Sequence, residues 1–463
     1  MDLLLDERTA SKVLDAALKE GGEFAELYAE RRRTTSLSME DSRIESSSTG
    51  LDAGVSIRVT RGRDISFVST DSMDESSLLE AARLAGAGLA GGRAGLKQLA
   101  LIDHPSPHVI AIAPSSVAAR EKADMLRAAD AAARGAGSEI VQASIGFSDE
   151  FSEIMIANSE GTLAAESRTR VRLSARAVGV RGQVMQTGAD SLGAHKGMEL
   201  FKEREPADVG LVAAQKALIM LDSQPSPSGK MTVVMHRGFG GVLFHEACGH
   251  GLEADTIEKG SSVFAGRMGE LVASELVTLV DDGSIPGEWG SNAFDDEGVP
   301  TGRTVLIEKG RLAGFMYDGL RARTLGAKST GNGRRQSFRH PPIPRMTNTF
   351  ILAGEHKPED IFAATEKGFY AKTLAGGQVE PATGDFVFGV SEGYLIENGR
   401  ITTPLRGATL IGNGLTALGN IDMIADDFEM HIGICGKDGQ GVPVGSGQPT
   451  LRILDMTVGG TEV

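Results

Sequence analysis

Two histidines and a glutamate lie close together in the stretch HEACGHGLEAD, residues 245–255, and these residue types bind and use metal ions. His245 and Glu246 begin like the zinc motif H-E-x-x-H, but Gly249 occupies the place of its second histidine and the next histidine is His250. In H-E-x-x-H the histidines are four residues apart and share one helix face. Residues five apart lie about 140° apart around a regular α-helix. A shared metal ion therefore requires a distorted helix here.

Glycine on both sides of His250 allows the backbone to leave regular helical geometry. A wider, π-type turn brings residues five apart nearly into line. We therefore predict that the helix departs from α geometry between Cys248 and His250. The alternative is that His245 and His250 are ordinary polar residues at a helix end, because short motifs recur by chance.

Three features of the surrounding sequence favour a catalytic zinc site. The motif follows a buried-type strand and a glycine turn, MTVVMHRGFGG, which is a usual place for an active site. Glu246 directly follows a histidine, where a general base can reach a metal-activated water. The polar run GLEAD continues after it. Zinc prefers histidine nitrogen and cysteine sulfur, and a catalytic site keeps one coordination position open.

The residues alone leave the third protein ligand open. Cys435 lies in the glycine-rich segment GICGKDGQGVPVGSGQP, which can approach a metal closely. Cys248 projects about 60° away from His245 on the same helix, which favours a small core residue. The candidates are Cys435, Cys248, His236, Glu253, Asp255 and His340.

The elements that position these residues fall into two halves of the 463-residue chain. Helical patterns at 9–20, 74–90, 115–135 and 208–221 accompany long strand-like runs at 24–70, 140–161 and 169–182. The Ser- and Pro-rich segment SQPSPSGK, residues 223–230, is the best domain boundary. We predict an α+β protein with an N-terminal α/β region of long strands and packed helices over 1–224. A sub-boundary is expected near 91–114, and a β-rich C-terminal domain over 230–463 carries the metal-site helix.

Three other features of the sequence have structural interpretations. Residues 306–318 and 395–405 each predict a strand, a tight turn and a returning strand of one sheet system, and Asn398-Gly399 is a strong hairpin signal. The basic run RTRVRLSAR, residues 168–176, predicts the polar face of a strand rather than a nucleic-acid site. The four arginines of RRQSFRHPPIPR, residues 334–345, lie among prolines that indicate an ordered loop, and arginine suits carboxylate recognition.

Composition excludes several other functions. The net charge of -15 argues against nucleic acid or an anionic membrane as the main partner. No segment approaches the roughly 20 apolar residues of a membrane helix, and the N-terminus lacks the features of a signal peptide. Two cysteines make a disulfide framework unexpected and fit a reducing cytoplasm. Neither a P-loop nor a G-x-S-x-G elbow is evident.

Longer motifs resemble the TldD/PmbA family of zinc metalloproteases, and in particular its TldD branch. The resemblance covers the C-terminal half strongly and the N-terminal half by general layout. The segments that carry it are GVLFHEACGHGLEAD, KGSSVFAGRMGE, RQSFRHPPIPRMTNTFI, GGQVEPATGDFVFGVSEGYLIENG, GATLIGNG and GICGKDGQGVPVGSGQPTL.

The resemblance implies His245, His250 and Cys435 as zinc ligands and Glu246 as general base. It also implies pairing with a PmbA (TldE) subunit that lacks the metal motif, and cleavage of unfolded or extended peptides, including maturation of peptide antibiotics and removal of antitoxins. Cys248 is a departure, because a small aliphatic residue is expected there in many relatives.

The expected function is that of a cytoplasmic zinc peptidase acting on unfolded or extended polypeptide, as a homodimer or with a PmbA-like subunit. The first alternative is a zinc hydrolase or tailoring enzyme for a small amide. The second is a non-catalytic, zinc-stabilised subunit. Glu246 argues against the second alternative, because a structural zinc site does not need a base.

Overall fold

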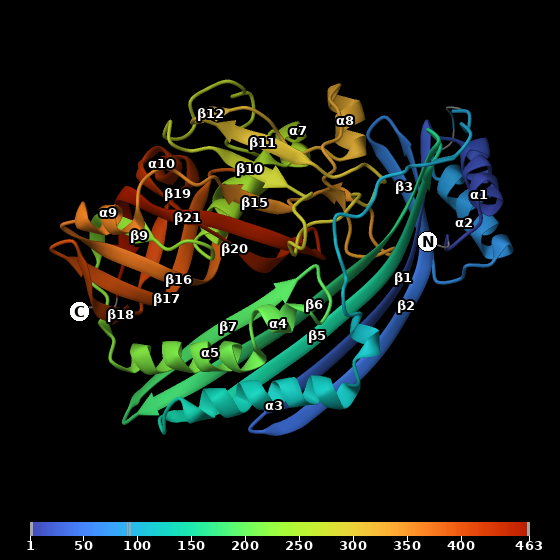
Figure 1. The fold of residues 1–463 in the computed structure, drawn as a ribbon. Helices are drawn as coiled ribbons and strands as arrows, with labels where there is room; N and C mark the ends of the chain where they lie inside the picture. The colour runs from blue at the N-terminus through green and yellow to red at the C-terminus, as the bar shows by residue number, and fades with distance from the viewer. Residues whose placement is uncertain (1–2, 90, 92–93, 461–463) are drawn as a thin grey trace.

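The computed structural model of the chain describes residues 3–89, 91 and 94–460, and it contains two large β-sheets (Figure 1). The N-terminal half builds one sheet and all of the long helices of the described residues, whereas the regular structure of the C-terminal half is mainly strand with short helices. The predicted α+β class with a β-rich C-terminal region is therefore confirmed.

In the described residues the N-terminal sheet has seven strands, in the order β3-β2-β1-β5-β6-β4 with β7 beside β6. All neighbours are antiparallel except the short β4, which runs parallel to β6. The strands are β1 (Phe24–Glu40), β2 (Arg43–Arg61), β3 (Asp64–Thr70), β4 (Ala100–Leu101), β5 (Ile140–Asn158), β6 (Thr162–Arg181) and β7 (Val184–Ala194). The helices are α1 (Glu7–Glu20), α2 (Glu75–Ala87), the 3-10 turn η1 (Pro114–Ser116), α3 (Ala119–Gly135), α4 (Leu200–Glu203) and α5 (Pro206–Leu221).

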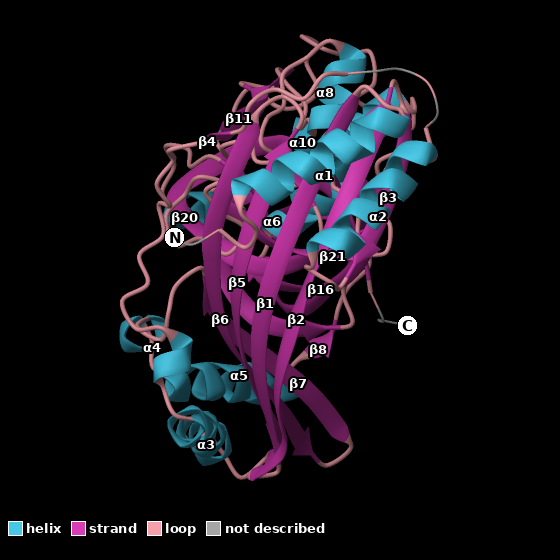
Figure 2. Cartoon of the chain, turned by 90° about the vertical axis from the view of Figure 1, so that its right-hand side faces the viewer, coloured by secondary structure: helices cyan, strands magenta, loops and turns pink. Residues whose placement is uncertain are grey.

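The long helices all pack on one face of this sheet. Side chains alternate between faces along a strand, and odd-numbered residues such as Leu27, Ile57 and Met155 form one core with α1 and α2. Farther along the same face, Phe147 and Leu173 form a second core with α3 and α5. Figure 2 shows α1 and α2 lying across β1 and β2. The opposite face is left to meet the C-terminal half.

Buried ion pairs join that opposite face to the C-terminal half. Arg58 on β2 is fully buried and pairs with Glu26 of β1 at 2.7 Å and with Glu297 of the C-terminal half at 2.5 Å. Arg168 on β6 pairs with Asp296 at 2.6 Å. Removing one partner of such a pair leaves an uncompensated buried charge. These contacts therefore fix the position of one half relative to the other.

The arginine-rich loop at 334–345 is ordered, as predicted, and its arginines bind groups of this chain. Arg335 hydrogen-bonds to the Glu26 carboxylate on β1. Arg345 is fully buried and donates to the backbone carbonyl of Cys435. The loop therefore links the N-terminal sheet to the segment that carries Cys435.

The second sheet has twelve strands in the described residues, in the order β12-β11-β10-β15-β21-β9-β16-β17-β18-β8, with β19 and β20 also paired to β21. Its strands are β8 (Gln224–Pro225), β9 (Gly229–Met235), β10 (Leu279–Asp282), β11 (Arg303–Glu308), β12 (Arg311–Leu312), β15 (Asn348–Ile351), β16 (Lys367–Glu380), β17 (Asp385–Glu397), β18 (Arg400–Arg406), β19 (Thr409–Asn413), β20 (Ile421–Lys437) and β21 (Gln440–Gly459). The two-stranded sheet is β13 (Gly333–Arg334) and β14 (Ile343–Pro344). The helices are α6 (Gly241–Phe244), η2 (His245–Gly249), η3 (His250–Leu252), α7 (Ala254–Glu258), α8 (Gly319–Leu325), α9 (Pro358–Ala363) and α10 (Gly414–Gly419).

Only one of the two predicted hairpins forms in full. β17 and β18 pair as expected, with Asn398 and Gly399 at positive φ in the turn. The prediction for 306–318 is wrong beyond Leu312, because the returning strand β12 has two residues. The chain then leaves the sheet, and the Met316 N–H donates to the carbonyl of Leu252 in the metal-motif segment.

The predicted domain limits, 1–224 and 230–463, stay predictions. Residues 92 and 93, at the start of the expected sub-boundary near 91–114, lie outside the described residues. As for membrane insertion, no helix in the described part of the chain is both long and apolar enough to cross a bilayer.

Candidate metal centre

The helix that carries the histidines is widened where the spacing requires it. α6 ends at Phe244, a π-helical turn follows over His245–Gly249, and a 3-10 turn continues from His250. The predicted departure from α geometry is confirmed. A Cβ at position 249 would lie 2.1 Å from the sulfur of Met346, so Gly249 lets the buried Met346 side chain pack against this turn. The wide turn brings the rings of His245 and His250 to 5.5 Å between centroids.

Cys435 joins the two histidines from β20. The ligand atoms of His245, His250 and Cys435 all lie within 4.8 Å of one another, and Cys435 Sγ is 3.3 Å from His250 Nε2. His245 Nδ1 is buried and has no hydrogen-bond partner in the described part of the chain. One nitrogen from each histidine and the cysteine sulfur fit a zinc ion with three protein ligands and an open fourth position. The unsatisfied ring nitrogen of His245 agrees with a polar partner that the protein itself does not supply.

The electrostatics of the centre favour the thiolate form of Cys435. Burial raises the pKa of the Cys435 thiol, but attraction and hydrogen bonds from His245 and His250 outweigh burial and hold this pKa well below its usual value. Burial likewise lowers the pKa of His250, but the charges of Glu253 and Cys435 and their hydrogen bonds hold it well above its usual value. Cys435, His245 and His250 would hold a metal ion, and the groups that lower the Cys435 pKa favour the thiolate form that binds metal.

A second set of residues orients His250. The Glu253 carboxylate is fully buried and lies 2.9 Å from His250 Nδ1. Lys437 Nζ donates to Glu253 at 2.8 Å and to Asp255 at 2.6 Å. Burial raises the pKa of Glu253, but His250 and Lys437 bring it down to about 2. The charged carboxylate fixes the ring so that Nε2 faces Cys435, as outer partners of metal-binding histidines do.

Glu253 and Asp255, which the sequence offers as third ligands, thus both pair with Lys437, and neither belongs to the group of three. The sequence reasoning missed Lys437. Its only local signal is a single cation two residues after Cys435 in a glycine-rich segment.

Glu253→Gln is expected to weaken zinc binding about 10- to 100-fold, which is the usual effect of losing such an outer partner. Glutamine keeps the size of the side chain but loses the charge that holds His250 and Lys437. Competition with a chromophoric zinc chelator measures the change. Glu258→Gln, on α7 but paired with Arg63 outside the centre, is the matched control and should leave affinity unchanged. Equal affinities for both variants would contradict the orienting role.

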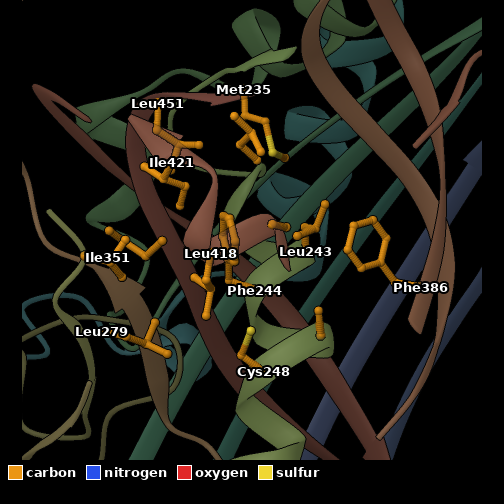
Figure 3. Close-up of a cluster of buried hydrophobic side chains, with 14 of the residues drawn as sticks. Met235, Leu243, Phe244, Cys248, Leu279, Ile351, Phe386, Leu418, Ile421 and Leu451 are labelled. Atoms are coloured by element: carbon orange, nitrogen blue, oxygen red, sulfur yellow. The ribbon is translucent and has the colours of Figure 1, made fainter. Parts of the chain in front are cut away.

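The remaining candidate ligands lie elsewhere. Cys248 points into the apolar core near Phe244 and Leu418 (Figure 3). Its burial there raises its pKa to about 12, so it stays a neutral thiol. His236 Nδ1 lies 2.7 Å from the Tyr370 hydroxyl, and His340 Nδ1 lies 3.0 Å from Ser337 Oγ.

Glu246 lies at the open side of the centre. Its carboxylate is 3.7 Å from His250 Nε2, and its side chain is 36% exposed. It does not belong to the group of three ligand atoms. A carboxylate that is close to the ligands and open to solvent can reach a water molecule beside them.

Three sequence models of one family together match most of the chain. They are described as the PmbA/TldA metallopeptidase C-terminal domain, matching residues 228–460, the central domain, matching 112–221, and domain 1, matching 25–88. The C-terminal match includes every residue of the centre.

Individual relatives agree with the family models. A metalloprotease TldD homolog of Haemophilus influenzae is 40% identical over 99% of this chain and 97% of its own length. A zinc metalloprotease TldD homolog of Saccharolobus solfataricus is 29% identical over 97% of this chain and 99% of its own length. The crystal structure of TldE from Thermococcus kodakarensis has the same fold, with a TM-score of 0.78 at 21% identity over 98% of this chain and all of that one. The chain belongs to the TldD/PmbA metallopeptidase family, on its TldD branch.

Proposed function

We propose that this protein is a zinc-dependent peptidase that cleaves unfolded or extended polypeptides, with His245, His250 and Cys435 as metal ligands and Glu246 as general base. The observation that carries the proposal is the group of three ligand atoms within 4.8 Å of one another, beside the solvent-open carboxylate of Glu246. The names of the relatives, which are metalloproteases and in one case a zinc metalloprotease, support it.

The roles of the protein groups follow from their positions. Zinc, when bound, supplies Lewis acidity towards a peptide carbonyl and activates water for attack. Glu246 accepts the proton of the attacking water and passes it to the leaving amine. Glu253 and Lys437 hold His250 in place throughout. Because both carboxylates near Lys437 are paired and buried, Glu246 is the carboxylate free to move a proton.

An exposed strand edge offers a way to hold an extended chain. β16 pairs with β9 only through Phe369, Tyr370 and Ala371. In the described part of the chain Thr373, Leu374 and residues 377–380 pair with β17 alone, with an irregular register between 371 and 377, and β16 contacts η2 of the metal motif. A peptide added along this edge is held by backbone hydrogen bonds, which fits loose sequence preference. The edge of β20 is less suited, because Trp289 and Arg345 already bind the carbonyls of Gly433 and Cys435.

Incubation of the zinc-loaded protein with an unfolded protein, followed by mass spectrometry of the products, tests the function. We expect internal peptide products that are absent when the metal is removed. Hydrolysis of small amides alone would instead support the small-substrate alternative, and no hydrolysis of either would support a non-catalytic subunit.

We also propose that the protein works as a two-subunit assembly, either with itself or with a TldE-like chain. The structural likeness to a TldE protein supports a pairing of two chains of one fold. Light scattering of the protein alone and with a TldE-like chain is expected to show a dimer in at least one case. A stable monomer that cleaves polypeptide would contradict this expectation.

A further inference from the structure

A cleft of about 700 Å³ lies between the two halves of the molecule. One wall comes from β6, β7 and α5, and the other from β16, β17, β20 and the segment before α6. The cleft residues do not include the metal ligands or Glu246. The edge of β16 that could receive a peptide lines it through Thr373, Leu374 and Ala375.

Strand β20 runs from the cleft to the metal centre. His431 lines the cleft, and Cys435 lies on the same strand without a bulge between them. Their separation of four residues puts both side chains on one face, about 13 Å apart along the strand. Phe239, which precedes α6, contacts the His431 ring at 4.3 Å between centroids. An extended peptide spans this distance with about four residues.

The carboxylates of the cleft are already paired. Glu392 binds Lys372 at 2.8 Å, and Glu429 binds Arg237 at 3.0 Å. The third, Asp190, binds both Arg204 and Lys216. The acidic side chains of the cleft are therefore compensated from within the protein.

Two arginines of the cleft are different. Arg172 and Arg176 belong to the basic run at 168–176 and point from the same face of β6. In the described part of the chain neither forms an ion pair within 4.0 Å. Arg172 is half-buried, its Nε has no hydrogen-bond partner, and burial alone lowers its pKa. A partly desolvated cation without a partner costs free energy. The chain has a net charge of -15, so the lack of a paired carboxylate at Arg172 is not caused by a shortage of acidic residues.

We propose that this cleft binds the polypeptide substrate and that Arg172, which lines the cleft together with His431, pairs with an acidic side chain of it, four or more residues from the bond that is cleaved. The inference rests on the proposed peptidase function and adds a substrate preference to it. A guanidinium matches a carboxylate through two parallel hydrogen bonds. Backbone contacts along β16 would hold any sequence, whereas Arg172 would favour peptides with aspartate or glutamate at this distance.

The test measures binding without cleavage, on the zinc-loaded Glu246→Gln variant. Fluorescence anisotropy compares an unstructured peptide of Gly, Ser, Ala and Thr that has one glutamate with the same peptide that has glutamine instead. We expect the glutamate peptide to bind about tenfold more tightly, as a partly buried charge-assisted pair allows. Arg172→Gln should remove the difference. Arg33→Gln, the same change at an exposed arginine on β1 outside the cleft, should preserve it.

A charge-reversal variant distinguishes a loss of charge pairing from a loss of folding. Arg172→Glu should prefer a lysine peptide over the glutamate peptide, and zinc content and melting temperature report whether each variant is folded. Equal binding of the glutamate and glutamine peptides by the protein with Arg172 intact would overturn the inference, whether or not the variants fold. So would a preference that persists in folded Arg172→Gln. If the unaltered centre binds the glutamate peptide selectively but cleaves no polypeptide, the proposed function fails and the binding site stands. If the protein cleaves polypeptide but shows no acidic preference, the proposed function stands and the inference about Arg172 fails.

Discussion

Replacing Glu246 by glutamine is expected to remove nearly all peptidase activity while zinc content and fold stay unchanged. The glutamine side chain is nearly isosteric and still forms hydrogen bonds, but it cannot accept the proton of the attacking water. Losing a general base typically lowers the rate about 10²- to 10⁴-fold. Zinc affinity should change little, because the Glu246 carboxylate lies outside the group of three ligand atoms.

The measurement combines zinc content with turnover of an unfolded protein for wild type, Glu246→Gln and the control Glu258→Gln. Full activity of Glu246→Gln would mean that another base acts. Glu253 and Asp255 are the next candidates, but both are buried and paired with Lys437. Loss of zinc from Glu246→Gln would make Glu246 a ligand and would overturn the proposed centre.

Local patterns in the sequence were sufficient for several features of this structure. The five-residue separation of His245 and His250, flanked by glycines, predicted a widened turn because no regular helix could bring the two rings together. The Asn398-Gly399 pair predicted the β17–β18 hairpin because a tight hairpin turn needs positive φ at both positions. In each case a geometric requirement acts within a few residues.

Features that depend on distant contacts could not be predicted in the same way. Lys437 neutralises Glu253 across 184 positions of sequence, and nothing local to either residue indicates the pair. β1 and β2 continue far beyond their apolar runs into polar sequence, because each polar segment is paired along its length with the other strand. β12 is short for a related reason. The chain leaves the sheet after Leu312, and the Met316 N–H donates to the carbonyl of Leu252 in the metal-motif segment.

The choice of the third ligand belongs to the same class. Six residues were open on chemistry alone, and only the family resemblance selected Cys435. In the structure this cysteine reaches His250 across 185 positions of sequence, on a strand whose backbone Arg345 holds.

Cys435→Ser is expected to abolish stable zinc binding, whereas Cys248→Ser should retain one zinc per chain. The two cysteines differ in their surroundings. The Cys435 sulfur lies beside two histidines that favour the thiolate, which is the form that binds metal. Cys248 lies in an apolar core that keeps it neutral. A serine hydroxyl at 435 is a far weaker ligand, so the loss of affinity should exceed the roughly 10- to 100-fold effect of an outer partner.

Elemental analysis after gel filtration, together with chelator competition, distinguishes the two cysteine variants. Cys248→Ser buries a hydroxyl in the core and should lower the free energy of unfolding by about 1–3 kcal/mol, so its melting temperature should fall while zinc remains. Cys248→Ala keeps the site apolar and separates that stability effect from metal binding. If Cys248→Ser loses the metal while Cys435→Ser keeps it, the ligand assignment is wrong. Retention by both variants would mean that the Cys435 sulfur is not needed to hold the ion.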